Sequence, residues 1–127
     1  MGDFKIRNNI LFRYSGNERY VTIPMGVEII GDSAFYGCSV KSVRIPSSVT
    51  EIERRAFAQC KSLEKVNIPS NVRRIGESAF NECLELNTLI ISEGVEEIDN
   101  NAFSKCGFCC NYKLYYFHLL CNLLLKN

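Results

Sequence analysis

The sequence has few of the residues from which most catalytic and metal sites are built. It contains one histidine, His118, and no tryptophan in 127 residues. A single histidine excludes every metal site that needs two or more histidines, and it leaves one candidate base for a Ser-His or Cys-His pair. No Gly-x-Gly-x-x-Gly loop, phosphate-binding loop or acid pair in a catalytic motif occurs. We therefore expect that the chain is not an enzyme and holds no metal or cofactor.

The chain also lacks an excess of charge of either sign. Its 15 lysines and arginines oppose 14 aspartates and glutamates, which gives a formal net charge of +1 at pH 7. Nonspecific nucleic-acid binding needs a clustered basic surface, so we expect no nucleic-acid partner. Apolar residues make up 46% of the chain, which is enough for one core, and the length suits a single domain.

The start of the sequence shows no secretory signal, because residues 1–7 contain no uninterrupted apolar run. The cysteines number seven, and an odd total does not make a closed disulfide framework. Thiols that stay reduced in a cytoplasm-like compartment are the default interpretation.

What the sequence does contain is a repeat. An Ala-Phe pair occurs four times, and a cysteine stands three residues after each phenylalanine. With the residues around them, these pairs follow the pattern I-P-x-x-V-x-x-I-x-x-x-A-F-x-x-C-x-x-L-x-x-V-x. The recurring residues are Phe35, Phe57, Phe80 and Phe103, with Cys38, Cys60, Cys83 and Cys106, and the cysteines are 22, 23 and 23 residues apart. A unit of this length cannot bury its own apolar face, so the pattern predicts a solenoid of stacked coils.

Each coil contains one segment that alternates between apolar and polar residues. Residues 42–45, 65–68 and 88–91 show this period of 2 and are predicted to form short parallel strands about 4.7–4.9 Å apart. The Val-x-x-Ile and Ala-Phe-x-x-Cys stretches are expected to form the return path, as a short extended piece and one helical turn. The four phenylalanines would fill the core, and the four cysteines would form a column of small buried hydrophobes.

A metal or redox role for the cysteines is the alternative. Cys106 and Cys109 form a Cys-x-x-Cys pair, and Cys121 and His118 are the other possible ligands near it in sequence. Cys106 belongs to the repeat column, and a thioredoxin-like pair needs a βαβ context that is missing here. The structural interpretation is therefore favoured.

The N-terminal end differs from the repeats, as a cap must. Residues 10–14 alternate, residues 15–17 form a turn and residues 20–23 alternate again, so residues 1–22 are predicted to form a capping hairpin. Four repeats follow, at residues 23–44, 45–67, 68–90 and, in part, 91–107.

The C-terminal residues 108–127 are predicted to be a degenerate strand and an apolar tail. Tyr112 and Leu114 fall where the valine and isoleucine of a fifth strand would sit, and the register is then lost. The apolar run is short of a membrane span, so membrane contact is not expected. We interpret the tail as a cap or as a contact for self-association through the C-terminal end; an extension with no evolved role is the alternative.

The repeat I-P-x-x-V-x-x-I-x-x-x-A-F-x-x-C-x-x-L resembles the BspA-like, or treponeme-type, leucine-rich repeat over about residues 4–114. The resemblance implies an α/β-type leucine-rich-repeat solenoid, a right-handed coil with a parallel β-sheet on its concave face and short helical turns on its return path. Members of this family are mostly large cell-surface or secreted proteins of bacteria and parasitic protists. They are implicated in adhesion and have no catalytic residues.

Residues that point outward from the strands are the candidates for ligand binding. Core packing does not dictate them, and a solenoid joins them into one contiguous concave surface. They are Tyr20, Thr22, Ser42, Arg44, Lys65, Asn67, Thr88 and Ile90. The predicted function is a noncatalytic, adhesin-like interaction module for a protein or surface glycan ligand. The alternatives are that these residues are simply solvated, and that the chain is a structural repeat fragment of a longer cell-surface protein without binding activity of its own.

Overall fold

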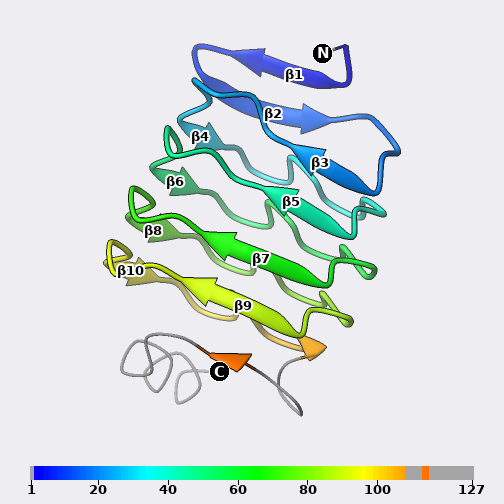
Figure 1. Ribbon diagram of the computed structural model, residues 1–127, viewed down its shortest axis with the longest axis vertical. Helices are drawn as coiled ribbons and strands as arrows, with labels where there is room; N and C mark the ends of the chain where they lie inside the picture. Colours follow the sequence, from blue (N-terminus) through cyan, green and yellow to red (C-terminus); the bar gives the residue numbers. More distant parts are fainter. Residues whose placement is uncertain (1, 108–112, 115–127) are drawn as a thin grey trace.

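The chain folds into a β-solenoid of about four turns, in which two sheets run along the stack of coils (Figure 1). The computed structural model describes residues 2–107 and 113–114. The termini of the described chain lie at opposite ends of the stack, because each coil follows the previous one along a single axis (Figure 1).

The first sheet has five strands, which the sequence pattern predicts from its alternating segments. Its order is β11-β9-β7-β5-β3, and all neighbouring pairs are parallel. The strands are β3 (Tyr20–Thr22), β5 (Ser42–Arg44), β7 (Lys65–Ile68), β9 (Thr88–Ile91) and β11 (Lys113–Leu114). Alternate residues of β7 are buried and exposed, as a strand with one face on the core requires.

The second sheet has six strands in the order β1-β2-β4-β6-β8-β10. Four of them are two-residue strands from the Val-x-x-Ile stretches, which are thus the extended pieces expected on the return path. The strands are β1 (Phe4–Arg7), β2 (Ile10–Tyr14), β4 (Ile29–Ile30), β6 (Glu51–Ile52), β8 (Arg74–Ile75) and β10 (Glu97–Ile98).

The core between the sheets is a column of stacked aromatic rings. The ring centroids of Phe35 and Phe57 are 4.8 Å apart, and those of Phe57 and Phe80 are 5.0 Å apart. Phe103 continues the column at 5.0 Å from Phe80, and Tyr14 begins it at 5.0 Å from Phe35. These rings are buried, so one apolar spine joins all the coils.

The N-terminal hairpin is built from other strands than those predicted. The segments at residues 10–14 and 20–23 do not pair, because β2 and β3 lie in different sheets. Instead β1 pairs antiparallel with β2, around a turn in which Asn8 and Asn9 have φ of 52° and 64°. Asparagine tolerates this left-handed conformation and is common in two-residue hairpin turns.

The helical turn expected on the return path is not found, since the four Ala-Phe-x-x-Cys stretches contain no helix. The Ala-Phe-x-x-Cys stretches are turns in which residues with positive φ recur, such as Arg55 at 58° and Gln59 at 57°. A right-handed helix does not contain such residues. The backbone N–H of Phe57 donates to the carbonyl of Ala79 in the next coil at 2.7 Å. Hydrogen bonds between coils thus take the place of bonds within a helical turn.

The fifth strand of the first sheet is also shifted from its expected register. Leu114 of β11 lies opposite Leu89 of β9, which is the valine position of the repeat and not the isoleucine position predicted for it. Eight residues separate Leu114 from Cys106, whereas six separate Leu89 from Cys83. The connection is therefore two residues longer, a shift that preserves the alternation of a strand.

Candidate functional site

The five-stranded sheet brings the eight predicted ligand-binding residues together on one face. We call this surface the strand face. The register aligns Tyr20, Ser42, Lys65 and Thr88 in one row across the strands, and Thr22, Arg44, Asn67 and Ile90 in a second row. Five of these side chains are exposed, and those of Ser42, Thr88 and Ile90 are half-buried. Tyr20 is the most exposed large hydrophobic residue of the described chain, at 74%.

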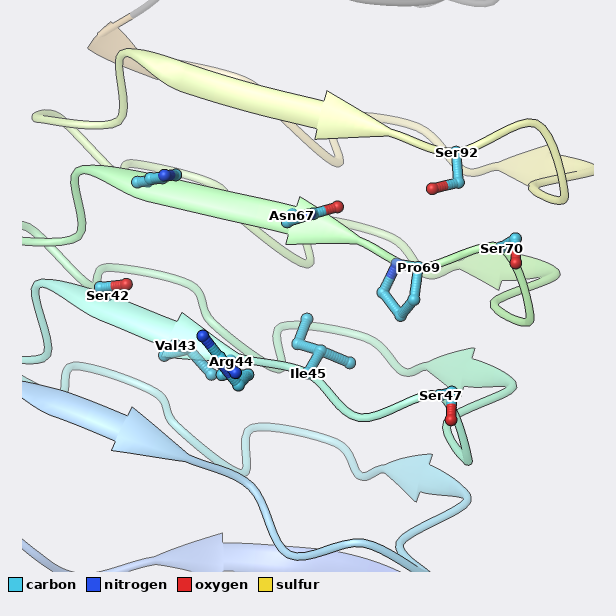
Figure 2. A pocket seen from close by; sticks show the side chains of 10 residues that line it. Ser42, Val43, Arg44, Ile45, Ser47, Asn67, Pro69, Ser70 and Ser92 are labelled. Carbon is cyan, nitrogen blue, oxygen red and sulfur yellow. The ribbon is translucent and has the colours of Figure 1, made fainter.

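A groove of about 590 Å³ runs across this face (Figure 2). Its lining consists of Ser42, Val43, Arg44, Ile45, Ser47, Lys65, Asn67, Pro69, Ser70 and Ser92. Figure 2 shows Arg44 and Asn67 on neighbouring strands, with Ser47, Ser70 and Ser92 in the segments beyond the strand ends. The groove therefore includes four of the predicted residues and extends past the sheet.

The hydroxyl groups at the end of this groove were missed by the sequence analysis. Ser47 and Ser70 each follow an Ile-Pro pair, and Ser92 takes the place of the proline in the next coil. The recurrence of serine after Ile-Pro was the available signal.

The groove is positively charged. Its lining contains two cations, Arg44 and Lys65, and no aspartate or glutamate. Neither cation has a carboxylate oxygen within 4.0 Å among the described residues. By contrast, the nearby Lys41 is paired with Glu64 at 3.8 Å.

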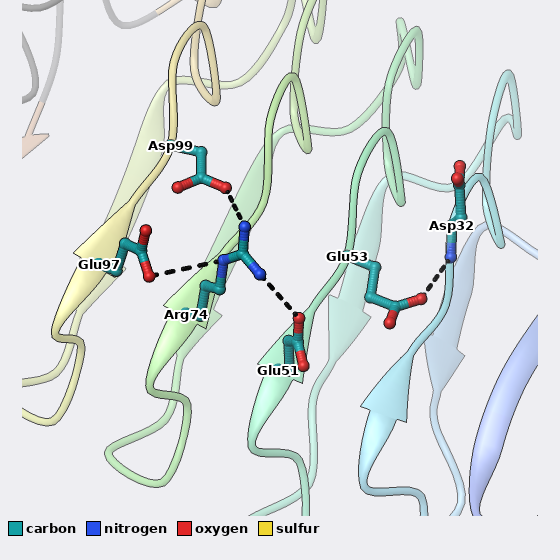
Figure 3. Close-up of polar contacts among 6 residues, drawn as sticks. All are labelled: Asp32, Glu51, Glu53, Arg74, Glu97 and Asp99. Atoms are coloured by element: carbon teal, nitrogen blue, oxygen red, sulfur yellow. Dashed lines mark hydrogen bonds and ion pairs between the residues drawn. The ribbon is translucent and has the colours of Figure 1, made fainter.

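The six-stranded sheet carries a cluster of carboxylates around one arginine (Figure 3). Arg74 on β8 contacts three carboxylates, Glu51 at 3.6 Å, Glu97 at 3.6 Å and Asp99 at 2.7 Å. The hydrogen bond to Asp99 and the charges of the three carboxylates raise the pKa of Arg74. Charges of opposite sign thus lie next to each other and join three successive coils.

A second charged pair lies beside this cluster. Arg54 contacts Asp32 at 3.5 Å, and the Glu53 carboxylate accepts a hydrogen bond from the Asp32 backbone N–H at 3.1 Å (Figure 3). Both Arg54 and Asp32 are more than half exposed, so the pair contributes little, about 0–1 kcal/mol. Both contacts join one coil to the next.

The cysteine column lies in the core. The thiols of Cys60, Cys83 and Cys106 are buried, and each donates to the carbonyl of a phenylalanine one coil earlier, at 3.0, 3.2 and 3.1 Å. Burial raises the pKa of Cys60, and the neighbouring thiol of Cys106 together with burial raises that of Cys83. Metal binding and thiol redox chemistry need an accessible thiolate, which these three buried thiols do not offer.

Cys38 differs from the rest of the column because it is half-buried at the first coil. Burial raises its pKa, and the charge of Arg13 opposes that shift. Of the other candidate ligands, Cys109, Cys121 and His118 lie outside the described residues.

The part of the chain that the structure describes holds no group of three or more histidines, cysteines, aspartates or glutamates placed for a metal ion. Every buried side-chain nitrogen and oxygen in that part has a hydrogen-bond partner. No helix within residues 2–107 and 113–114 is long and apolar enough to cross a membrane.

Comparison with known proteins gives a consistent result. The model of the BspA type leucine-rich repeat region matches residues 5–114, in six copies. A leucine-rich repeat protein from Bacteroides capillosus is 30% identical, with a TM-score of 0.76 over 88% of this chain and 92% of that one. The leucine-rich repeat protein of T. pallidum is 24% identical, with a TM-score of 0.64 over 84% of this chain and 66% of that one, and shows the fold alone.

A leucine-rich cell surface protein from Faecalibacterium prausnitzii is 30% identical, with a TM-score of 0.63. The match covers 87% of this chain but only 39% of that protein. No curated protein matches the chain at a significant level.

Proposed function

Because the chain belongs to the BspA-type leucine-rich repeat family, we propose that it is a noncatalytic interaction module of the adhesin-like type, which presents its strand face to a protein or surface ligand. The observation that carries this proposal is the alignment of eight side chains in two rows on one rigid sheet. Most of these side chains are exposed, and those of Arg44 and Lys65 make no ion pair among the described residues. Packing of the core therefore does not account for their identity.

In the proposed mechanism, the rigid sheet holds the ligand-binding side chains in fixed positions. Strands of neighbouring coils are hydrogen-bonded, and their inward residues belong to the same buried core as the phenylalanine column, so the strand-face residues are preorganised. Preorganised side chains lose little conformational freedom when a ligand binds, which favours affinity. Arginine and tyrosine are frequent anchors of interfaces, and Arg44 and Tyr20 supply one of each.

The proposed cellular location of the module is based on a similar protein. The Faecalibacterium prausnitzii protein is described as a cell surface protein, and its larger size suggests that repeats like these form part of longer surface chains. We propose a cell-surface or secreted location for the present chain on this ground.

The same relative favours a second candidate function. The chain matches only 39% of that protein, so it would also suit a structural repeat segment that spaces other parts of a surface protein and binds nothing itself. The two candidates differ in one respect, which is whether the isolated chain retains a partner through its strand face.

Affinity capture with matched variants separates the candidates. The immobilised chain is exposed to cell-surface extracts, and retained proteins and glycans are identified by mass spectrometry and then tested in purified form. A strand-face variant, Tyr20→Ala with Ile90→Asn, should lose the partner. A control variant, Tyr36→Ala with Leu84→Ser, removes the same kinds of exposed apolar residue elsewhere on the molecule and should keep it.

Asn67 already occupies the strand position of Ile90 in the preceding coil, so the Ile90→Asn change suits the fold. A partner that binds the strand-face variant as well as the wild type would contradict the proposed function. If no purified partner binds the wild-type chain, the structural candidate replaces it.

A further inference from the structure

We propose that the groove on the strand face binds an extended acidic peptide segment, two carboxylates of which contact Arg44 and Lys65. This inference rests on the proposed binding function of the strand face and adds the chemistry of the ligand. Its basis is the contrast in charge between the hollows of the molecule. The strand-face groove is lined by two cations and no acid, whereas a hollow on the six-stranded sheet has five acids, Asp32, Glu51, Glu53, Glu77 and Asp99, against two arginines, Arg54 and Arg74.

The two groove cations are available to a ligand. Four other cations of the central coils, Lys41, Arg54, Arg73 and Arg74, each lie within 4.0 Å of a carboxylate. Arg44 and Lys65 have no such partner among the described residues, and both side chains are exposed. Arg55 and Lys61 also make no ion pair among the described residues, but they lie outside the groove. An unpaired arginine offers a planar fork that holds a carboxylate through two hydrogen bonds, and lysine offers a point charge.

The spacing of the cations matches an extended peptide. Ser42 lies opposite Lys65, and Arg44 is two residues further along β5. Strands about 4.8 Å apart, with a rise of about 3.3 Å per residue, place the two Cα atoms roughly 8 Å from each other. In an extended peptide, side chains at positions i and i+2 share a face and are about 6.6 Å apart, a gap that the flexible cation side chains can span.

The rest of the lining favours a peptide over an acidic glycan. Serine hydroxyls and the Asn67 amide can donate to and accept from the backbone of an extended chain. Pro69 and Ile45 give the groove an apolar part beside its cations. The groove has no aromatic ring on which a sugar face could stack, and its two cations are few for a polymer with a charge on every unit.

Binding of a defined probe tests the inference. The probe is a fluorescein-labelled peptide, Gly-Ser-Glu-Ser-Glu-Ser-Gly, and its affinity for the full 127-residue chain is measured by fluorescence polarisation. The variant Arg44→Asn with Lys65→Thr should bind the probe about tenfold more weakly or worse, because charge-assisted hydrogen bonds are lost. Raising the salt concentration should weaken wild-type binding, because the contacts are exposed.

The variants are chosen so that folding is preserved. Lys65 lies opposite Thr88, and Arg44 is equivalent to Asn67 of the next coil, so both new residues already occur at these positions. The control, Arg55→Ser with Lys61→Ser, removes two exposed positive charges outside the groove. Ser33 and Ser78 share the positive φ of Arg55 at the equivalent turn position. Thermal melts verify that all three proteins are folded.

The control should bind the probe as the wild type does, and a probe with glutamine in place of glutamate should not bind. Equal binding of the acidic probe to the wild type and the groove variant would overturn the inference. A uronic-acid oligosaccharide that binds more tightly than the peptide, and is lost in the groove variant, would overturn the choice of a peptide. If the Tyr20 and Ile90 variant loses a captured partner that the acidic probe cannot displace, the inference fails and the proposed function stands.

Discussion

Phe57 stabilises the stack of coils because its ring contacts the rings of both neighbouring coils. Its side chain is fully buried, and its ring is stacked between those of Phe35 and Phe80. Each stacked pair joins two coils, so the ring contributes to two interfaces at once. Aromatic pairs of this kind are worth about 0.5–1.5 kcal/mol beyond the burial of their area.

Replacing Phe57 with alanine should lower the free energy of unfolding by about 3–5 kcal/mol, because a buried ring is lost and a cavity remains. Urea denaturation followed by circular dichroism measures the change. Phe12→Ala is the control, since Phe12 is 47% exposed on β2, and its loss should cost well under about 1 kcal/mol. A loss of less than about 1 kcal/mol for Phe57→Ala would mean that the column does not hold the coils together.

The buried thiols make stability depend on pH. The pKa values of Cys60 and Cys83 are raised in the folded chain, so the folded state keeps protons that the unfolded state releases above its thiol pKa of about 8.5. The contribution of these groups is complete below about pH 8.5 and is lost as the pH rises above it. Each thiol can lower the free energy of unfolding by about 1.4 kcal/mol per pH unit in that range.

Urea denaturation at pH 7.5, 9 and 10 tests this dependence. The wild type should lose stability with rising pH more steeply than the variant Cys60→Ala with Cys83→Ala, by up to about 2.7 kcal/mol per pH unit. The comparison cancels the titration of lysine and tyrosine, which both proteins share. Parallel slopes in the two proteins would show that the thiols are not buried as described.

At the scale of the element, the strands were predictable and the turns between them were not. Alternation at residues 65–68 and 88–91 marks β7 and β9, because a half-buried strand exposes every second side chain. The return turns carry no such signal. Arg55 and Gln59 are not residues that favour a positive φ, and their conformation results from hydrogen bonds to the next coil. Only contacts distant in sequence determine this shape.

The candidate site likewise has a part that the sequence predicts and a part that it does not. Its strand residues, such as Arg44 and Lys65, follow from the alternation alone. The groove needs in addition the serines after the strand ends, and their position depends on how the turns fold back. The hairpin was misassigned because Asn8 and Asn9, which form its turn, lie before the first alternating segment that was considered.

Gln59 gives a test of the return turn. Its φ is 57°, while Gly37 at the equivalent turn of the first coil has a φ of 70°. Gln59→Gly should change stability by less than about 1 kcal/mol, because relief of strain offsets the greater freedom of the unfolded chain. Gln59→Val should lower it by about 1–2 kcal/mol or more, since branching at Cβ disfavours a positive φ.

Both variants can be compared in the same urea titration. Valine tolerated as well as glycine would indicate that the turn is not left-handed at this residue, and that the expected helical turn forms after all.

At the scale of the whole molecule, the two sheets differ in how their charged side chains are paired. The six-stranded sheet uses its charges internally, since Arg74 joins carboxylates of the coils on either side of it. On the five-stranded sheet, Arg44 and Lys65 have no carboxylate partner among the described residues, and most of the aligned side chains are exposed. A repeat that needs the same core in every coil is free to vary only these outer positions, which is where recognition can be encoded.

The central claim is that a partner binds the strand face, and lysine acetylation of the complex tests it most directly. Lys65 on β7 and Lys61 in the turn before it belong to one coil, and both are exposed. The chain is acetylated with and without its captured partner, and the modification of each lysine is measured by mass spectrometry. We predict that the partner protects Lys65 several-fold and leaves Lys61 and Lys105 unchanged. Protection of Lys61 or Lys105 with Lys65 still fully reactive would contradict the account.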